Sequence, residues 1–105
     1  MKTMTTAQHL ILETTPGGIL QREFLEPLEL SQAELARRTG LPTSRITEII
    51  KGRRTITAET AVALAAFFGN SAQFWLNLQT GCDLRRVEME KADDIRARVK
   101  PLSAA

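Results

Sequence analysis

Hydrophobic residues recur along the chain with helical spacing, and prolines and glycines divide it into segments of roughly ten residues. No segment alternates between apolar and polar residues as a strand does. A first helix is predicted over residues 19–26, with Ile19, Leu20 and Leu25 on its apolar side and Pro27 ending it. The pattern therefore predicts an all-α fold of short helices.

A second helix is predicted to begin at Gln32. The preceding Ser31 and the following Glu34 have the spacing of a capping box, in which each side chain accepts a hydrogen bond from the other residue's backbone N–H. The helix is expected to end near Thr39, because Gly40 adopts the left-handed conformation of a tight turn without strain.

A third helix is predicted from about Thr43 to Lys51. Ile46, Ile49 and Ile50 fall at i, i+3 and i+4 and form one apolar side. The opposite side carries small polar and charged residues. This arrangement predicts a helix that docks on a bundle by one face and leaves the other face free.

Two further helices follow. Thr57 is expected to cap the fourth, which Gly69 closes, and Ser71 is expected to cap the fifth. Beyond Cys82, residues 83–100 are charged, with apolar residues spaced among the charges. This stretch fits either a helical extension or a frayed tail.

The chain has 105 residues, which fits one small domain whose core is small enough to favour oligomerisation. We expect an N-terminal extension over residues 1–15, a helical bundle over 16–90 and a charged C-terminal tail over 91–105. The net charge is only +2, but residues 31–60 hold six basic and three acidic side chains. The basic block is therefore central.

Little in the composition points to catalysis or to a cofactor. The chain has one cysteine, one histidine and no tyrosine, and it has no phosphate-binding or dinucleotide-binding glycine motif. We expect no enzyme, no bound metal and no cofactor. A single cysteine and the absence of a long apolar run predict a cytoplasmic protein with no membrane partner.

The second and third helices, joined across Gly40, have the sequence form of a helix-turn-helix. The free face of the third helix is predicted to read base edges in the major groove, and basic side chains around it are predicted to contact phosphates. Gln32 is placed to hold a phosphate at the start of the second helix. The predicted DNA-binding residues are Gln32, Thr43, Ser44, Arg45, Thr47, Glu48, Lys51, Arg53 and Arg54.

The same residues resemble a known family. Ser31-Gln32, Leu35-Ala36, Gly40, Ile46, Ile49 and Gly52 are similar to the helix-turn-helix pattern of the phage-repressor-like XRE family. A narrower likeness covers roughly residues 16–90. There Pro16-Gly17, Phe24-Leu25-Glu26-Pro27-Leu28, Gly52-Arg53-Arg54, Ile56-Thr57, the run from Phe74 to Gln79 and Asp83-Leu84 resemble HigA-type antitoxins.

The resemblance implies a five-helix, lambda-repressor-like DNA-binding bundle with a C-terminal helical extension. It further implies a homodimer that binds double-stranded operator DNA upstream of its own operon and neutralises a HigB-type ribonuclease toxin. The chain departs from the family at its third helix, where Pro42 precedes Thr43-Ser44. The operator sequence is therefore not transferable from relatives.

The bulky pair Phe74 and Trp75 fits two roles. Such residues most often lie in a core, but aromatic side chains are also enriched at interfaces. The sequence leaves both roles open. The candidate dimer interface comprises Phe74, Trp75, Leu76, Leu78 and Cys82.

Two other functions remain open at this point. One is a stand-alone XRE-type transcriptional regulator with no toxin partner. The other is a protein-interaction module that keeps the helix-turn-helix only as a scaffold. If a basic toxin is bound, acidic residues outside the central block are its candidate contacts. They are Glu13, Glu23, Glu26 and Glu29 before the block, and Glu88, Glu90, Asp93 and Asp94 after it.

Overall fold

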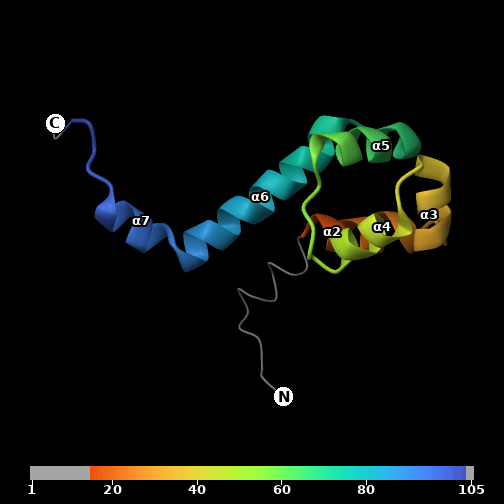
Figure 1. Ribbon diagram of the computed structural model, residues 1–105, viewed down its shortest axis with the longest axis horizontal. Helices are drawn as coiled ribbons and strands as arrows, with labels where there is room; N and C mark the ends of the chain where they lie inside the picture. The colour runs from red at the N-terminus through yellow and green to blue at the C-terminus, as the bar shows by residue number, and fades with distance from the viewer. Residues whose placement is uncertain (1–14, 104–105) are drawn as a thin grey trace, which may run out of the picture.

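The computed structural model describes residues 15–103, which form helices joined by short loops and contain no strand (Figure 1). The predicted all-α class is confirmed. The helices are α2 (Pro16–Ile19), the π-helix η1 (Leu20–Leu25), α3 (Gln32–Thr39), α4 (Thr43–Ile50), α5 (Ala58–Phe68), α6 (Ala72–Glu90) and α7 (Ala92–Arg98).

The first helical segment begins earlier than the sequence pattern predicts. We expected it at Ile19, but it starts at Pro16, and the hydroxyl of Thr15 accepts the Gly18 N–H at 3.0 Å. Proline suits a first helical turn because its missing N–H has no partner there. The segment then widens into η1, where the Glu26 N–H donates to the Gln21 carbonyl five residues back.

The core lies between two layers. In Figure 1, α5 and the start of α6 form one layer, α2 and α4 form the other, and α3 closes one end. Leucine and isoleucine side chains from η1, α3, α4 and α5 are buried between them. The fully buried ones include Leu20, Leu25, Leu35, Ile46, Ile49 and Leu64.

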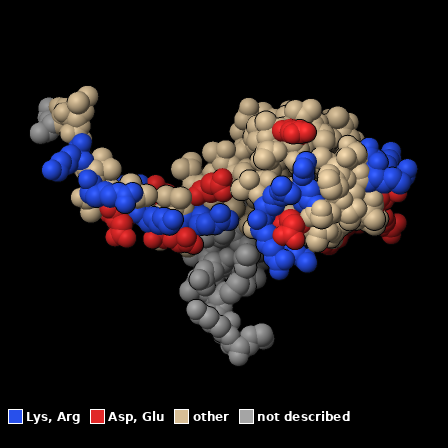
Figure 2. Space-filling model, viewed as in Figure 1, with Lys and Arg blue, Asp and Glu red and all other residues tan. Residues whose placement is uncertain are grey.

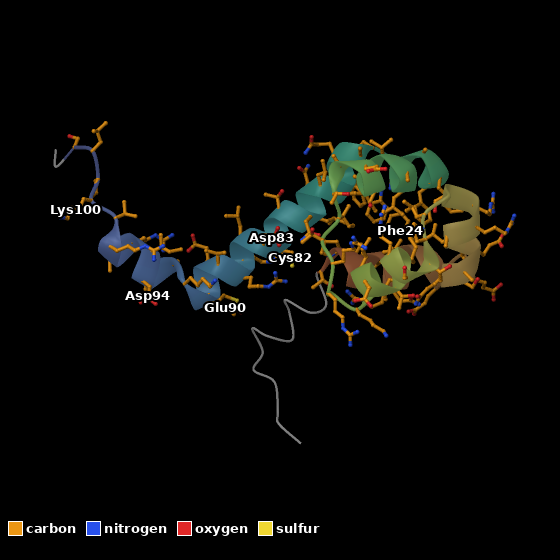
Figure 3. All side chains as sticks on the ribbon, viewed as in Figure 1. Phe24, Cys82, Asp83, Glu90, Asp94 and Lys100 are labelled. Carbon is orange, nitrogen blue, oxygen red and sulfur yellow. The ribbon has the colours of Figure 1, made fainter. Side chains whose placement is uncertain are left out.

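An aromatic cluster joins η1, α5 and α6. The Phe24 ring lies 4.8 Å from Phe68 and 4.9 Å from Trp75, measured between ring centroids. These tilted contacts add to the area that the rings bury. Phe24 lies between the two layers (Figure 3). The cluster therefore fixes how the N-terminal segment packs against α6.

The charged stretch after Cys82 is a helical extension. α6 continues to Glu90, and after Lys91 the chain forms α7. The second half of α6 runs away from the bundle, and α7 follows it (Figure 1). No helix in residues 15–103 is long and apolar enough to span a membrane.

Candidate nucleic-acid interface

The start of α3 is capped as predicted, but only half of the expected capping box forms. The Ser31 hydroxyl accepts the Glu34 N–H at 3.0 Å. The Glu34 carboxylate binds Arg37 instead of the Ser31 backbone. The hydrogen bond from the Arg37 guanidinium lowers the pKa of Glu34, and the same contact raises the pKa of Arg37.

The turn between α3 and α4 forms as predicted. Gly40 lies in the left-handed region at φ +79°, and its N–H closes α3 by donating to the Ala36 carbonyl. Pro42 is the N-cap of α4 and makes no side-chain cap bond, so α4 begins at Thr43. The two helices thus form a helix-turn-helix.

The two faces of α4 differ as predicted. Ile46 and Ile49 are fully buried against the bundle. The opposite side chains reach solvent: Thr43 and Ser44 are exposed, and Arg45, Thr47 and Glu48 are half-buried. A row of small polar groups on a helix about 10–12 Å wide matches a major groove about 12 Å wide.

A hydrogen bond joins the first residue of α3 to the exposed face of α4. The Thr47 hydroxyl donates to the Gln32 side-chain oxygen at 2.9 Å. Since the amide oxygen is occupied, the Gln32 NH₂ group is left as a donor to a ligand such as a phosphate. The bond also fixes the relative position of two predicted DNA-binding residues.

The loop after α4 carries the predicted phosphate-binding residues. Lys51, Arg53 and Arg54 are exposed. Figure 2 shows basic side chains (blue) near the end of α4, and they surround a small acidic patch (red). Glu48 lies 3.8 Å from the Arg53 guanidinium. Arg53 therefore exchanges this exposed and weak ion pair for any phosphate it binds.

Gln79 is a residue of this region that sequence reasoning did not nominate for a role in the interface. Its side-chain oxygen accepts the Ile56 N–H at 2.8 Å, and its NH₂ group donates to Asp83 at 3.0 Å. Gln79 thus ties the basic loop to α6. The sequence shows Gln79 four residues before Asp83, but polar residues at this spacing are common on helices. The spacing therefore does not indicate the contact of Gln79 with the loop.

The backbone of α2 at Gly17 lies in close contact with the backbone of α4. A side-chain carbon built on Gly17 would lie 2.0 Å from the Ile49 carbonyl oxygen, so only glycine fits there. The sequence shows the glycine but not its neighbour, because the contact joins α2 to a helix some thirty residues later. Gly17 therefore lets α4 pack directly against the N-terminal segment.

The candidate dimer residues lie in different environments. Trp75 is fully buried, and its indole N–H donates to the Asn70 side chain at 2.8 Å. Cys82 is also buried. Leu76 and Leu78 pack partly against the core, and Phe74 is 38% exposed. Trp75 is therefore a core residue in the single chain, and neither it nor Cys82 offers surface to a partner.

Other apolar side chains are exposed on the projecting half of α6. Leu84 is 60% exposed and Val87 is 39% exposed. Together with Leu76 they lie on one helix face, since their spacing is eight and three residues. The sequence showed these apolar residues among charges, but it could not show that residues 15–103 leave them exposed.

Comparisons with known proteins agree with this geometry. A helix-turn-helix family model matches residues 21–75. Virulence-associated protein I of Dichelobacter nodosus is 47% identical over 76 residues, covering 72% of this chain and 70% of that protein. Antitoxin HigA-1 of Vibrio cholerae is 36% identical over 86 residues, covering 82% of this chain and 80% of that protein. The solved structure described as Pseudomonas aeruginosa antitoxin HigA with higBA promoter superposes with a TM-score of 0.80 at 35% identity, covering 85% of this chain and 97% of that chain.

Proposed function

Because the chain belongs to the helix-turn-helix family of HigA-type antitoxins, we propose that it binds operator DNA, represses its own operon and neutralises a ribonuclease toxin of the HigB type. The observation that carries DNA binding is the exposed face of α4. Thr43, Ser44 and Thr47 point away from the buried isoleucines of the same helix. This face is free to meet base edges.

Contacts around α4 support its placement on a duplex. The Gln32 NH₂ group and the side chains of Lys51, Arg53 and Arg54 surround the free face and are suited to phosphate oxygens. Such contacts fix the register of a protein on DNA but carry no sequence information. In this proposal Ser44 and Glu48 determine which sequence is preferred.

The chain acts as a dimer in this proposal. Leu76, Leu84 and Val87 form an apolar face on α6 that the single chain leaves partly exposed, and a second copy would cover it with the same face. A two-fold dimer presents two copies of α4 to half-sites about 10 bp apart. Phe74 and Leu78 also keep partial exposure, but they lie two residues from Leu76 and therefore on the other side of α6.

A dimerisation variant tests that arrangement. Val87→Asp places a charge on the proposed interface but lies outside the core, so the variant should fold and sediment as a monomer at micromolar concentration. Glu90→Gln, one turn further along α6, is the matched control and should remain dimeric. A dimeric Val87→Asp variant would contradict the proposed face.

The toxin is bound by an acidic cluster in this proposal. Glu23, Glu26 and Glu29 are exposed, and no described basic residue forms an ion pair with them. The acids of α6 and α7 are less suited, because Arg96 binds Glu88 at 2.6 Å and the remaining acids lie close in sequence to Lys91, Arg96 and Arg98. Glu13 lies outside the described residues.

Two charge-reversal variants separate the two activities. Arg53→Glu together with Arg54→Glu should abolish the gel shift of DNA from upstream of the operon and leave toxin neutralisation intact. Glu23→Lys together with Glu26→Lys should have the opposite effect. Circular dichroism checks folding in both. If both activities fail together in every folded variant, the two surfaces overlap and the assignment is wrong.

The other functions correspond to distinct outcomes of the same experiment. Operator binding without capture of a co-expressed toxin would indicate a stand-alone transcriptional regulator; relatives from Escherichia coli and Haemophilus influenzae are described as uncharacterized HTH-type transcriptional regulators. Failure of the wild-type chain to bind duplex DNA would indicate a protein-interaction module. Either result would refute part of the proposal.

A further inference from the structure

A cavity of about 220 Å³ lies between the basic loop after α4 and the start of the projecting half of α6. Arg53, Arg54 and Thr55 line it from the loop, and Gln79 and Arg86 line it from α6. A water molecule needs only about 10–15 Å³ of such space, so the cavity has room for a phosphate group. Cys82 and Asp83, where α6 leaves the bundle, mark its position in Figure 3.

The charged side chains that line the cavity are basic. Three arginines line it, and among residues 15–103 no aspartate or glutamate does, although Glu48 pairs with Arg53 and Asp83 pairs with Arg86 from outside the wall. Arg54 makes no hydrogen bond or ion pair with any other described residue. Its charge is therefore available to a ligand. Guanidinium groups suit phosphate in particular, because their fork of donors matches two phosphate oxygens.

The α6 side of the cavity is already held in place. The Arg86 guanidinium lies 3.7 Å from the Asp83 carboxylate and 3.5 Å from the Cys82 sulfur. Asp83 also accepts from Gln79, whose side chain holds the loop through the Ile56 N–H. These contacts bring an arginine of α6 beside the arginines of the loop, and they reduce the ordering cost of binding.

We propose that this cavity binds a phosphate group of the DNA backbone, and that Arg86 is a DNA-contacting residue together with Arg53 and Arg54. The inference rests on the proposed DNA binding and extends it to α6, outside the helix-turn-helix. Because α6 also carries the proposed dimer face, phosphate binding at Arg86 places the DNA backbone next to the dimer contact.

Salt dependence of duplex binding tests the proposal. Each lost phosphate contact reduces the slope of log K against log salt by about 0.9. Arg86→Gln removes one contact from each chain of the proposed dimer, so it should lower the slope by about 1.8 on a mixed-sequence duplex measured by fluorescence anisotropy. Between 50 and 200 mM salt, its affinity should therefore fall about 12-fold less than that of the wild type.

Arg85→Gln is the matched control, because it removes the same charge from the neighbouring position of α6 without touching the cavity. It should keep the wild-type slope. Arg86→Lys retains the charge and should keep most of the slope, which separates phosphate binding from a purely structural role of the side chain. Equal slopes for Arg86→Gln and Arg85→Gln would overturn the proposal.

Titration with inorganic phosphate distinguishes the source of the ligand. We expect millimolar phosphate to shift the NMR signals of the Arg54 and Arg86 side chains and not those of Arg85. Phosphate binding without a changed duplex slope in Arg86→Gln would assign the cavity to a soluble anion and overturn the DNA assignment. If the wild type binds no duplex, the proposed function itself fails, whereas wild-type DNA binding with an unchanged slope refutes only this inference.

Discussion

Replacement of Gly17 by alanine should destabilise the protein and displace α4. The added carbon would lie 2.0 Å from the Ile49 carbonyl oxygen and 2.7 Å from the Ile50 Cα, whereas ordinary van der Waals contacts lie at 3.4–4 Å. Both neighbours are backbone atoms, which have no alternative rotamer. The two segments therefore have to separate.

The size of the effect follows from two opposing contributions. Overpacking a well-filled interior costs about 1–3 kcal/mol, and a clash with backbone lies at the upper end of that range. Alanine in a helix is favoured over glycine by about 1 kcal/mol. We therefore expect Gly17→Ala to lose about 2 kcal/mol net, which corresponds to a fall of about 8–16 °C in Tm for a domain of this size.

Urea denaturation, followed by circular dichroism, measures this change. The urea concentration at the midpoint should fall, and the dependence of the unfolding free energy on urea concentration should stay constant. Gly81→Ala is the matched control. Its added carbon would meet only the end of the flexible Arg85 side chain, at 3.4 Å. That variant should gain up to about 1 kcal/mol, because Gly81 lies inside α6.

The two substitutions thus have opposite expected signs. In addition, Gly17→Ala should weaken DNA binding at temperatures where the variant is still folded, because α4 carries the proposed base-reading face. Equal stability of Gly17→Ala and the wild type would refute the close approach of α2 to α4. A stability loss without weaker DNA binding would refute the link between that approach and the interface.

Three further predictions concern single side chains. The pairing with Arg37 lowers the pKa of Glu34 in the folded state, so it stabilises the fold at pH values above the ordinary pKa of 4.5. This contribution is lost as the pH falls through the lower folded-state pKa. Glu34→Gln should therefore flatten that part of an acid-unfolding curve. Ser71→Ala removes the acceptor of the Phe74 N–H and should cost about 1 kcal/mol in thermal unfolding. Ser44→Ala should change which sequence a selection from random duplexes enriches, with little effect on the salt slope, and an unchanged preference would contradict base reading by that side chain.

Local signals in the sequence were sufficient for the helix boundaries around the turn. Ser31 and Gly40 bound α3 as predicted, and Gly69 ends α5. Caps and left-handed turn residues act over three or four positions, so their effect is readable from the chain itself. The two-sided character of α4 was likewise predictable, because its isoleucines follow the helical period.

Pro16-Gly17-Gly18 shows where local reading fails. These residues look like a break, yet they form the first turn of α2, because Thr15 supplies a cap and Gly17 meets the backbone of α4. Proline and glycine are common in loops, but proline also suits the first turn of a helix. Only the neighbouring helix decides between them.

Tertiary packing also decided which apolar residues are core and which are surface. Trp75 and Leu84 both lie on α6, but Trp75 is enclosed by Phe24 and Phe68, whereas Leu84 lies beyond the end of the bundle. The sequence determined the ends of α3, the cap at Ser31 and the polar face of α4, because these depend on residues close in the chain. The cavity of Arg53, Arg54 and Arg86 depends on residues more than thirty positions apart, and only the fold brings them together.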